Sequence, residues 1–116
     1  MGKISLINQR DMLLVPFPFS DQSGKKVRPV IVLSNNDFNT NSEDIIVVGI
    51  TSNIIKDKYS LNFSNNDLDE GKLVTKCLIK VESILKIDQD LAIKKIGKIK
   101  EQNLQLIKNK LLELLN

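Results

Sequence analysis

The sequence predicts a mainly β fold: a small, strongly bent antiparallel sheet or barrel that is closed by one C-terminal helix. Short apolar runs rich in β-branched residues recur along the chain, and polar segments rich in Asn, Asp and Gly separate them. The last segment changes to the helical spacing of apolar residues. The length of 116 residues suits one domain, 1–116, and leaves no room for a second core.

The first three strands are expected in apolar runs. "DMLLVPF" (11–17) is strand-like, and its prolines direct its end to the edge of a sheet or out of it. "RPVIVLS" (28–34) and "DIIVVGI" (44–50) are almost continuously apolar, which is typical of strands that are buried on both faces.

Two further strands are expected later in the chain. "YSLNF" (59–63) alternates apolar and polar residues, as a strand with one solvated face does. "KLVTKCLIKVESILKI" (72–87) is longer and is expected to bend or break near Lys80. The segments "SNNDFNTNSED" (34–44) and "SNNDLDEGK" (64–72) are predicted to be turns because of their Asn, Asp and Gly content.

The C-terminal segment "KEQNLQLIKNKLLELL" is predicted to be an amphipathic helix that caps the barrel. Its apolar stripe consists of Leu104, Ile107, Leu111 and Leu114. Leu106, Leu112 and Leu115 widen this apolar surface, which indicates a subunit interface and hence a homodimer. The charged residues from Lys94 to Lys110 are expected to form a solvated face.

The composition excludes several kinds of chemistry. The chain has no histidine, so serine triads, Cys–His pairs and histidine-ligated zinc are excluded. Cys77 is the single cysteine, so the chain forms no internal disulfide, and its apolar neighbours predict a place in the core. The scattered glycines form no phosphate-binding loop. Any chemistry must therefore use Arg, Lys, Asp, Glu, Ser, Thr or backbone groups, and no cofactor is expected.

The charge and hydropathy of the chain leave several partners open. With 17 Lys and Arg against 14 Asp and Glu, the net charge of +3 permits a polyanionic partner without demanding one. No apolar run approaches the ~20 residues that span a bilayer, and the first ten residues lack the apolar core of a signal peptide. A cytoplasmic protein with no membrane partner is expected.

Two residues from different strands are expected to meet at the rim of the sheet. Arg28 precedes the run 30–33 and Thr51 follows the run 45–50, so antiparallel pairing would place them side by side. A barrel of this size is filled by side chains, so a functional site belongs on its rim. There a guanidinium offers a planar fork to two phosphate oxygens. Alternatively, Arg28 only ends a loop and pairs with Asp21 or Glu43.

The run "DMLLVPFPFSDQSGKKVRPVIVLSN", followed by "IIVVGITS" and "LIKVESILKID", resembles the PemK/MazF family of bacterial toxins. The resemblance extends from Asp11 to the terminal helix. It implies an SH3-like barrel with a C-terminal helix, a homodimer, and a sequence-specific endoribonuclease that cleaves single-stranded RNA without a metal. It also implies a type II toxin–antitoxin system, in which a cognate antitoxin with an acidic, disordered segment inhibits the toxin.

The resemblance further implies that Arg28 and Thr51 are catalytic. RNA supplies its own nucleophile, the 2′-hydroxyl, so the protein has to orient that group and stabilise charge on the phosphate. One branch of the family has an Arg-x-Asp pair that Lys80 and Glu82 match here, which would support acid–base catalysis. Alternatively, these two residues form a surface ion pair, because residues two apart on a strand share a face. Arg10 stands where the family usually has glycine.

Five further residues are candidates for RNA binding. Lys25 and Lys26 attract phosphates or only solvate a turn. Tyr59 and Phe38 stack on unpaired bases or are buried. Ser52, directly after Thr51, belongs to the Thr-Ser pair of the resemblance.

A non-catalytic binding module is the alternative function. Toxins of the same barrel shape bind DNA gyrase and cleave nothing, and they use a C-terminal helix that ends in tryptophan and glycine. This chain has no tryptophan and ends in "LLELLN". An inactive member of the family that serves as a structural or regulatory partner is the other alternative.

Overall fold

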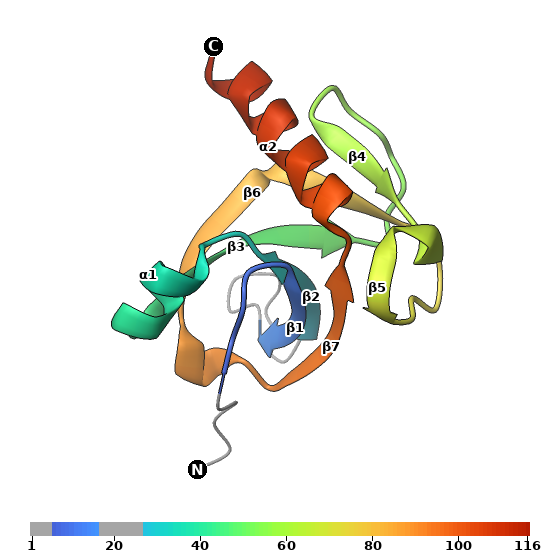
Figure 1. Ribbon diagram of the computed structural model, residues 1–116. Coiled ribbons are helices and arrows are strands. Elements are labelled where there is room, and N and C mark those ends of the chain that lie inside the picture. The colour runs from blue at the N-terminus through green and yellow to red at the C-terminus, as the bar shows by residue number, and fades with distance from the viewer. Residues whose placement is uncertain (1–5, 17–26) are drawn as a thin grey trace.

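A computed structural model describes residues 6–16 and 27–116, and this part of the chain forms seven strands and four helices (Figure 1). The strands are β1 (Asp11–Pro16), β2 (Val27–Val32), β3 (Asp44–Thr51), β4 (Ser60–Phe63), β5 (Leu68–Gly71), β6 (Cys77–Asp88) and β7 (Lys94–Ile99). The α-helices are α1 (Asn36–Asn41) and α2 (Glu101–Leu115), and the 3-10 helices are η1 (Asn65–Asp67) and η2 (Gln89–Leu91).

The strands of the described residues form a single antiparallel sheet in the order β4-β6-β3-β2-β1-β7-β5. The sheet curves strongly into a half-barrel, with β1 and β2 near its centre and α2 packed across it (Figure 1). The prediction of a mainly β, barrel-like fold with a C-terminal helix is therefore confirmed. The two ends of the sheet, β4 and β5, remain its edges.

The strands β2 and β3 are buried on both faces, which explains their continuous apolar sequences. Val30 and Val32 pack into one apolar cluster, whereas Ile31 between them packs into a second one on the opposite face. In β3, Val47 belongs to the first cluster and Val48 to the second. All five side chains are fully buried, so these strands are held rigidly from both sides.

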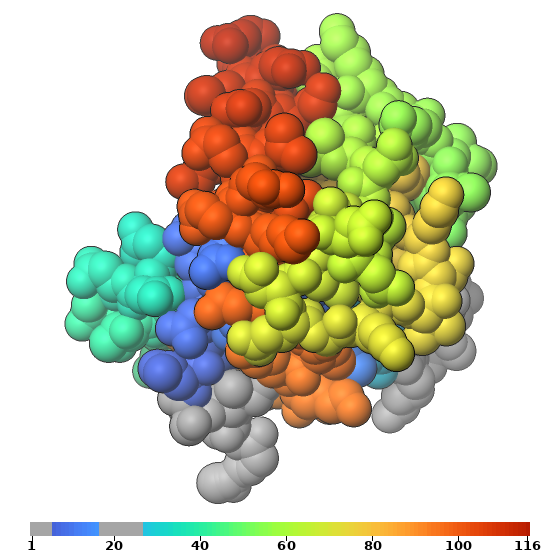
Figure 2. Space-filling model, turned by 45° about the vertical axis from the view of Figure 1, so that its right-hand side comes forward, coloured from blue at the N-terminus to red at the C-terminus, as the bar shows by residue number. Residues whose placement is uncertain are grey.

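The helix α2 packs its predicted stripe against the second of these clusters. Leu104 and Ile107 are buried there with Phe63 of β4, and Leu111 packs against them. Figure 2 shows α2 lying against the segment that carries β4. Leu106, Leu112 and Leu115 are exposed. No helix of the described residues is long and apolar enough to cross a membrane.

The long strand β6 bends where the sequence predicts a break. Val48 pairs with Ile84, but the next residue, Gly49, pairs with Lys80, so the register shifts between them. The extra residues of β6 form an irregularity that redirects the strand. As a result, one half of β6 pairs with β3 alone and the other half also pairs with β4.

Five elements of the described residues were not predicted from the sequence: α1, η1, β5, η2 and β7. The segment 34–44, predicted to be a turn, contains α1, whose first turn is capped by the Asn35 side chain accepting a hydrogen bond from the backbone N–H of Phe38 (2.8 Å). The segment 64–72 contains η1 and β5. In both segments, Asn and Asp cap or start short elements instead of forming turns alone.

The missed strand β7 lies in the lysine-rich segment that was expected to be solvated. Its Ile99 is fully buried, whereas Lys94 and Lys95 are exposed and Lys98 is partly buried. Lys95 forms ion pairs with the buried carboxylate of Asp11 (3.3 Å) and with Glu70 (3.2 Å). The strand contains only two apolar side chains, Ile96 and Ile99, so its sequence shows no clear alternation of apolar and polar residues.

Arg10 joins the start of β1 to the beginning of α2. Its φ angle is 81°, in the left-handed region that favours glycine, which gives a physical reason for the glycine that is usual in the family at this position. The guanidinium donates to the carbonyl of Ile99 (2.8 Å) and to Asp69 (3.1 Å), and it pairs with Glu101 (3.4 Å). These contacts offset the strain of a non-glycine residue.

Because Ile107 is fully buried between α2 and the sheet, Ile107→Ala is expected to lower the free energy of unfolding by about 2–5 kcal/mol. The matched control, Lys108→Ala, removes an exposed side chain and should change the free energy of unfolding by less than about 0.5 kcal/mol. Urea denaturation measures both values. Equal, small changes in the two variants would show that α2 does not stabilise the sheet.

Candidate functional site

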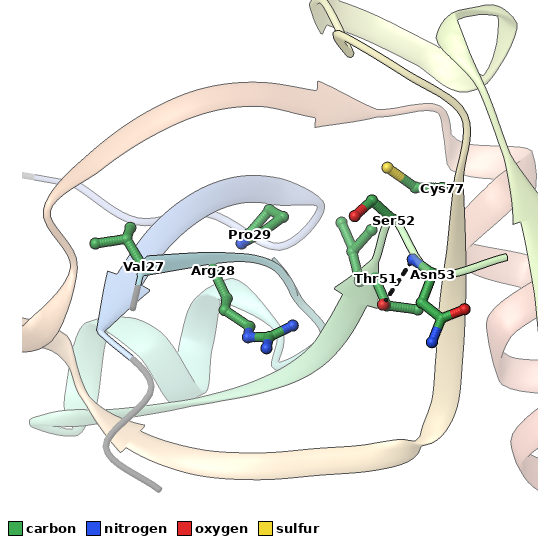
Figure 3. Close-up of a pocket in the computed structure, with 8 residues that line it drawn as sticks. Val27, Arg28, Pro29, Thr51, Ser52, Asn53 and Cys77 are labelled. Atoms are coloured by element: carbon green, nitrogen blue, oxygen red, sulfur yellow. Dashed lines mark hydrogen bonds between the residues drawn. The ribbon is translucent and has the colours of Figure 1, made fainter. Parts of the chain in front are cut away.

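A cleft of about 380 Å³ lies at the adjoining ends of β2 and β3. It is lined by Val27, Arg28, Pro29, Ile50, Thr51, Ser52, Asn53 and Cys77. The Arg28 side chain extends from β2 toward Thr51 at the end of β3 (Figure 3). Two residues that are 23 positions apart in the sequence thus line one cleft, as the expected antiparallel order of their strands predicts.

The register of the sheet explains this meeting. Val30 pairs with Gly49, and continuing the antiparallel register by two residues brings Arg28 opposite Thr51. Because side chains alternate along a strand, both residues are on the face that carries Val30. That face is apolar along the middle of the strands, and it becomes polar at their ends.

The hydroxyl of Thr51 is oriented by its own backbone. Its Oγ1 accepts a hydrogen bond from the backbone N–H of Asn53 (3.0 Å), which Figure 3 marks with a dashed line. The hydroxyl proton has no acceptor among residues 6–16 and 27–116. A hydroxyl donates one proton and accepts through two lone pairs, so Thr51 can donate to an anion in the cleft.

A smaller hollow of about 90 Å³ continues the site toward β6. It shares Arg28 and Thr51 with the main cleft and adds Gly49, Lys80 and Ser83. A Cβ at Gly49 would lie 3.4 Å from the Cβ of Ser83, so the glycine lets the Ser83 side chain lie close to β3. Two cationic residues, Arg28 and Lys80, thus line the same hollow.

Lys80 is held by two carboxylates. Its ammonium is 2.6 Å from Asp57 and 3.2 Å from Glu82, so Lys80 and Glu82 form the surface ion pair that was one of their two interpretations. Hydrogen bonds to Asp57 and Glu82 raise the pKa of Lys80. The hydrogen bond from Lys80 lowers the pKa of Asp57. Lys80 is therefore a fixed cation at neutral pH and is not available as a base.

The other predicted residues take different positions. Ser52 lines the main cleft. Tyr59 is half-buried, and Phe38 lies partly exposed on α1; neither lines the clefts around Arg28. Lys25 and Lys26 lie outside the described residues, as does Asp21, which was considered as a partner of Arg28.

Sequence reasoning missed three residues of the site. Asn53 donates its backbone N–H to the Thr51 hydroxyl, and the signal for such a turn is the threonine at the end of the strand. Asp57 pairs with Lys80 across a distance in sequence of 23 residues, for which the sequence holds no signal. Cys77 lies in the core as predicted, and burial raises the pKa of its thiol, but it also lines the cleft.

No three Cys, Asp or Glu side chains gather in a group suited to a metal ion within the described part of the chain. The polar groups of the cleft are instead a guanidinium, hydroxyls and an amide. These groups bind anions by charge and by hydrogen-bond donation.

The fold and the cleft define a small half-barrel protein with a guanidinium and hydroxyl groups together at the ends of two buried strands. The sequence pattern of one family, described as the PemK-like, MazF-like toxin of type II toxin-antitoxin systems, matches residues 8–115. The chain therefore belongs to this family of toxins. A comparison with curated proteins found no match.

Solved structures of low sequence identity share the fold. An endoribonuclease in complex with its cognate antitoxin, from a mycobacterial species, has a TM-score of 0.74 and 15% identity, and the match covers 94% of each chain. MazE-MazF from Deinococcus radiodurans has a TM-score of 0.74 at 16% identity, covering 97% of this chain and 98% of that one. The Mycobacterium tuberculosis toxin MazF-mt6 has a TM-score of 0.67 at 14% identity, with 90% of each chain covered.

The ion pair beside the cleft gives a prediction about pH. Because Lys80 lowers the pKa of Asp57, the pair stabilises the fold at neutral pH, and its contribution is lost as the pH falls through that lowered pKa. Lys80→Met should raise the pKa of Asp57 toward its ordinary value, although the backbone hydrogen bond from Tyr59 remains, and NMR titration of the carboxyl carbon measures the change. Lys86→Met, which removes an exposed lysine near Asp44, is the control. An unchanged pKa of Asp57 in Lys80→Met would contradict this account.

Proposed function

We propose that this chain is a sequence-specific endoribonuclease toxin that cleaves single-stranded RNA without a metal ion. The observation that carries the proposal is the corner formed by Arg28 and Thr51, in a chain that belongs to a toxin family. Two solved structures that share its fold are an endoribonuclease in complex with its cognate antitoxin and the toxin MazF-mt6. The histidine-free sequence supports a mechanism in which RNA supplies the nucleophile.

The proposed reaction is an internal transfer of the phosphoryl group. The 2′-oxygen forms a bond to the adjacent phosphorus and loses its proton to water in the open cleft. The bond from phosphorus to the 5′-oxygen breaks, and that oxygen takes a proton from water. The products are a 2′,3′-cyclic phosphate and a 5′-hydroxyl, and no external co-reactant is consumed.

In this reaction Arg28 stabilises the charge that grows on the phosphate. Its guanidinium can face two non-bridging oxygens at once, which an ammonium cannot do. Thr51 donates its oriented hydroxyl to the same phosphate. A preorganised donor of this kind is typically worth about 10²–10³ in rate.

Lys80 and Glu82 have a supporting role in this proposal. Lys80 adds a fixed positive charge to the small hollow, and Glu82 helps to hold it there. The RNA strand extends past Ser52 in the cleft. Lys25 and Lys26, which directly precede β2 in the sequence, would attract its phosphates, while Tyr59 and Phe38 would contact bases farther from the cut.

Two protein partners complete the proposal. Leu112 and Leu115 are 60% and 72% exposed on the last turns of α2, and covering them in a homodimer would remove apolar surface from water. A cognate antitoxin with an acidic, disordered segment would place carboxylates on the cationic cleft and exclude RNA. One structure with this fold is a complex with a cognate antitoxin, and another is MazE-MazF, which supports an antitoxin partner for this chain.

Cleavage should depend on Arg28 and Thr51 as one unit. In single-turnover cleavage of a short RNA with a chelator present, Arg28→Ala should remove nearly all activity, and Arg28→Lys should restore little. Thr51→Ala should be slower by about 10²–10³. The double variant should be hardly slower than Arg28→Ala, because effects within a catalytic unit are not additive.

Thr40→Ala is the matched control, because Thr40 is an exposed threonine of α1 away from the cleft. It should cleave at the rate of the unchanged chain, and thermal melting should show that all variants are folded. Full activity of folded Arg28→Ala, or cleavage that stops when the chelator is added, would contradict the proposed mechanism.

The partners are tested together by sedimentation velocity. The chain alone should be a dimer at micromolar concentration, and Leu112→Lys combined with Leu115→Lys should convert it to a monomer. A short protein with an acidic tail, encoded by a neighbouring gene, should add mass to the dimer and stop RNA cleavage. A monomeric wild-type chain that binds no such tail would overturn this part of the proposal.

A further inference from the structure

A second cleft, of about 330 Å³, adjoins the cleft of Arg28 and Thr51. It is lined by Ile54, Asn62, Phe63, Ser64, Lys76, Cys77 and Leu78. The two clefts share Cys77, and Asn53 of the first is followed in the chain by Ile54 of the second. They are therefore neighbouring clefts, one at the ends of β2 and β3 and the other at the ends of β4 and β6, and Cys77 lines both.

The second cleft has apolar side chains at its bottom and polar side chains at its edge. Phe63 and Leu78 are buried below it, and Ile54 at its side is 63% exposed. Asn62 on β4 and Lys76 just before β6 are both exposed. Neither polar side chain forms a hydrogen bond or an ion pair within residues 6–16 and 27–116.

This combination of groups matches an unpaired nucleotide. A base covers apolar side chains with its flat face and presents donors and acceptors along its edge. The Asn62 amide has one acceptor and two donors for such an edge, and the Lys76 ammonium supplies a positive charge for a phosphate. A purely apolar ligand would leave both polar groups without a partner in the complex.

We propose that the second cleft is a nucleotide subsite of the RNA groove. In it, Asn62 reads the edge of one base and Lys76 holds a phosphate of the same strand, beside the phosphate at Arg28. The subsite rests on the proposed function, and it adds a source of sequence preference at a single position near the cut.

The first test measures base preference. A pool of short single-stranded RNA, randomised around one mapped cut site, is cleaved and the products are sequenced. Asn62→Ala should reduce the discrimination between bases at one position by about tenfold and leave the other positions unchanged. Asn66→Ala is the matched control, because Asn66 is exposed nearby but does not line the cleft.

The second test measures binding without cleavage. The probe is a short RNA with a 2′-deoxynucleotide at the cut site, and its affinity is followed by fluorescence anisotropy at several salt concentrations. Lys76→Gln should weaken binding to every sequence and reduce the salt slope by about 0.7, the value for one phosphate contact on a single strand. Lys72→Gln, which changes an exposed lysine outside the cleft, should behave as the unchanged chain does.

Unchanged base preference in Asn62→Ala, or unchanged RNA affinity in Lys76→Gln, would overturn the subsite. The subsite would also be overturned if Asn62→Ala and Lys76→Gln weakened the binding of an acidic antitoxin segment and left the affinity for RNA unchanged. If the wild-type chain bound RNA but cut none, the proposed function would fail, whereas the binding test would still decide on the subsite.

Discussion

The burial of β2 and β3 on both faces is the constraint on which the rest of the structure depends. Each strand alternates its side chains between two apolar clusters. A slip by one residue would move every side chain into the cluster on the opposite face and disrupt the packing of both clusters. This arrangement fixes the positions of the strand ends, where the apolar residues give way to Arg28 and Thr51. The site is rigid because the core beneath it is closed on both sides.

The surroundings of this corner follow from the same sheet. The register shift in β6 opposite Gly49 bends the strand and brings Lys80 to the wall of the smaller hollow. There Asp57 and Glu82 hold the ammonium, so the positive charge beside Arg28 has a defined place. The next compartment, around Asn62 and Lys76, lies on the other side of Cys77. In the proposed complex, one phosphate of the RNA lies beside Arg28 and Lys80, and the neighbouring nucleotide lies in the cleft lined by Asn62 and Lys76.

The sequence predicted the parts of the fold that have strong patterns. The runs 28–34 and 44–50 are apolar throughout, and α2 has four apolar residues at helical spacing, so these elements and the meeting of Arg28 with Thr51 could be foreseen. The strand β7 was missed because three of its six residues are lysines, although its Ile99 is fully buried. The helix α1 was missed because its Asn and Asp residues are equally typical of turns. The pairing of Asp57 with Lys80 depends on the position of the segment before β4, which no local pattern encodes.

Two buried strands are proposed to hold Arg28 and Thr51 in the positions that bind one phosphate of an RNA strand. A crystal structure of the chain with a single-stranded RNA that carries a 2′-deoxynucleotide at the mapped cut site tests this proposal most directly. The account predicts that the phosphate at this position lies within hydrogen-bonding distance, about 3 Å, of both the Arg28 guanidinium and the Thr51 hydroxyl, with β2 and β3 unmoved. A phosphate bound elsewhere, or strands that shift to receive it, would contradict the account.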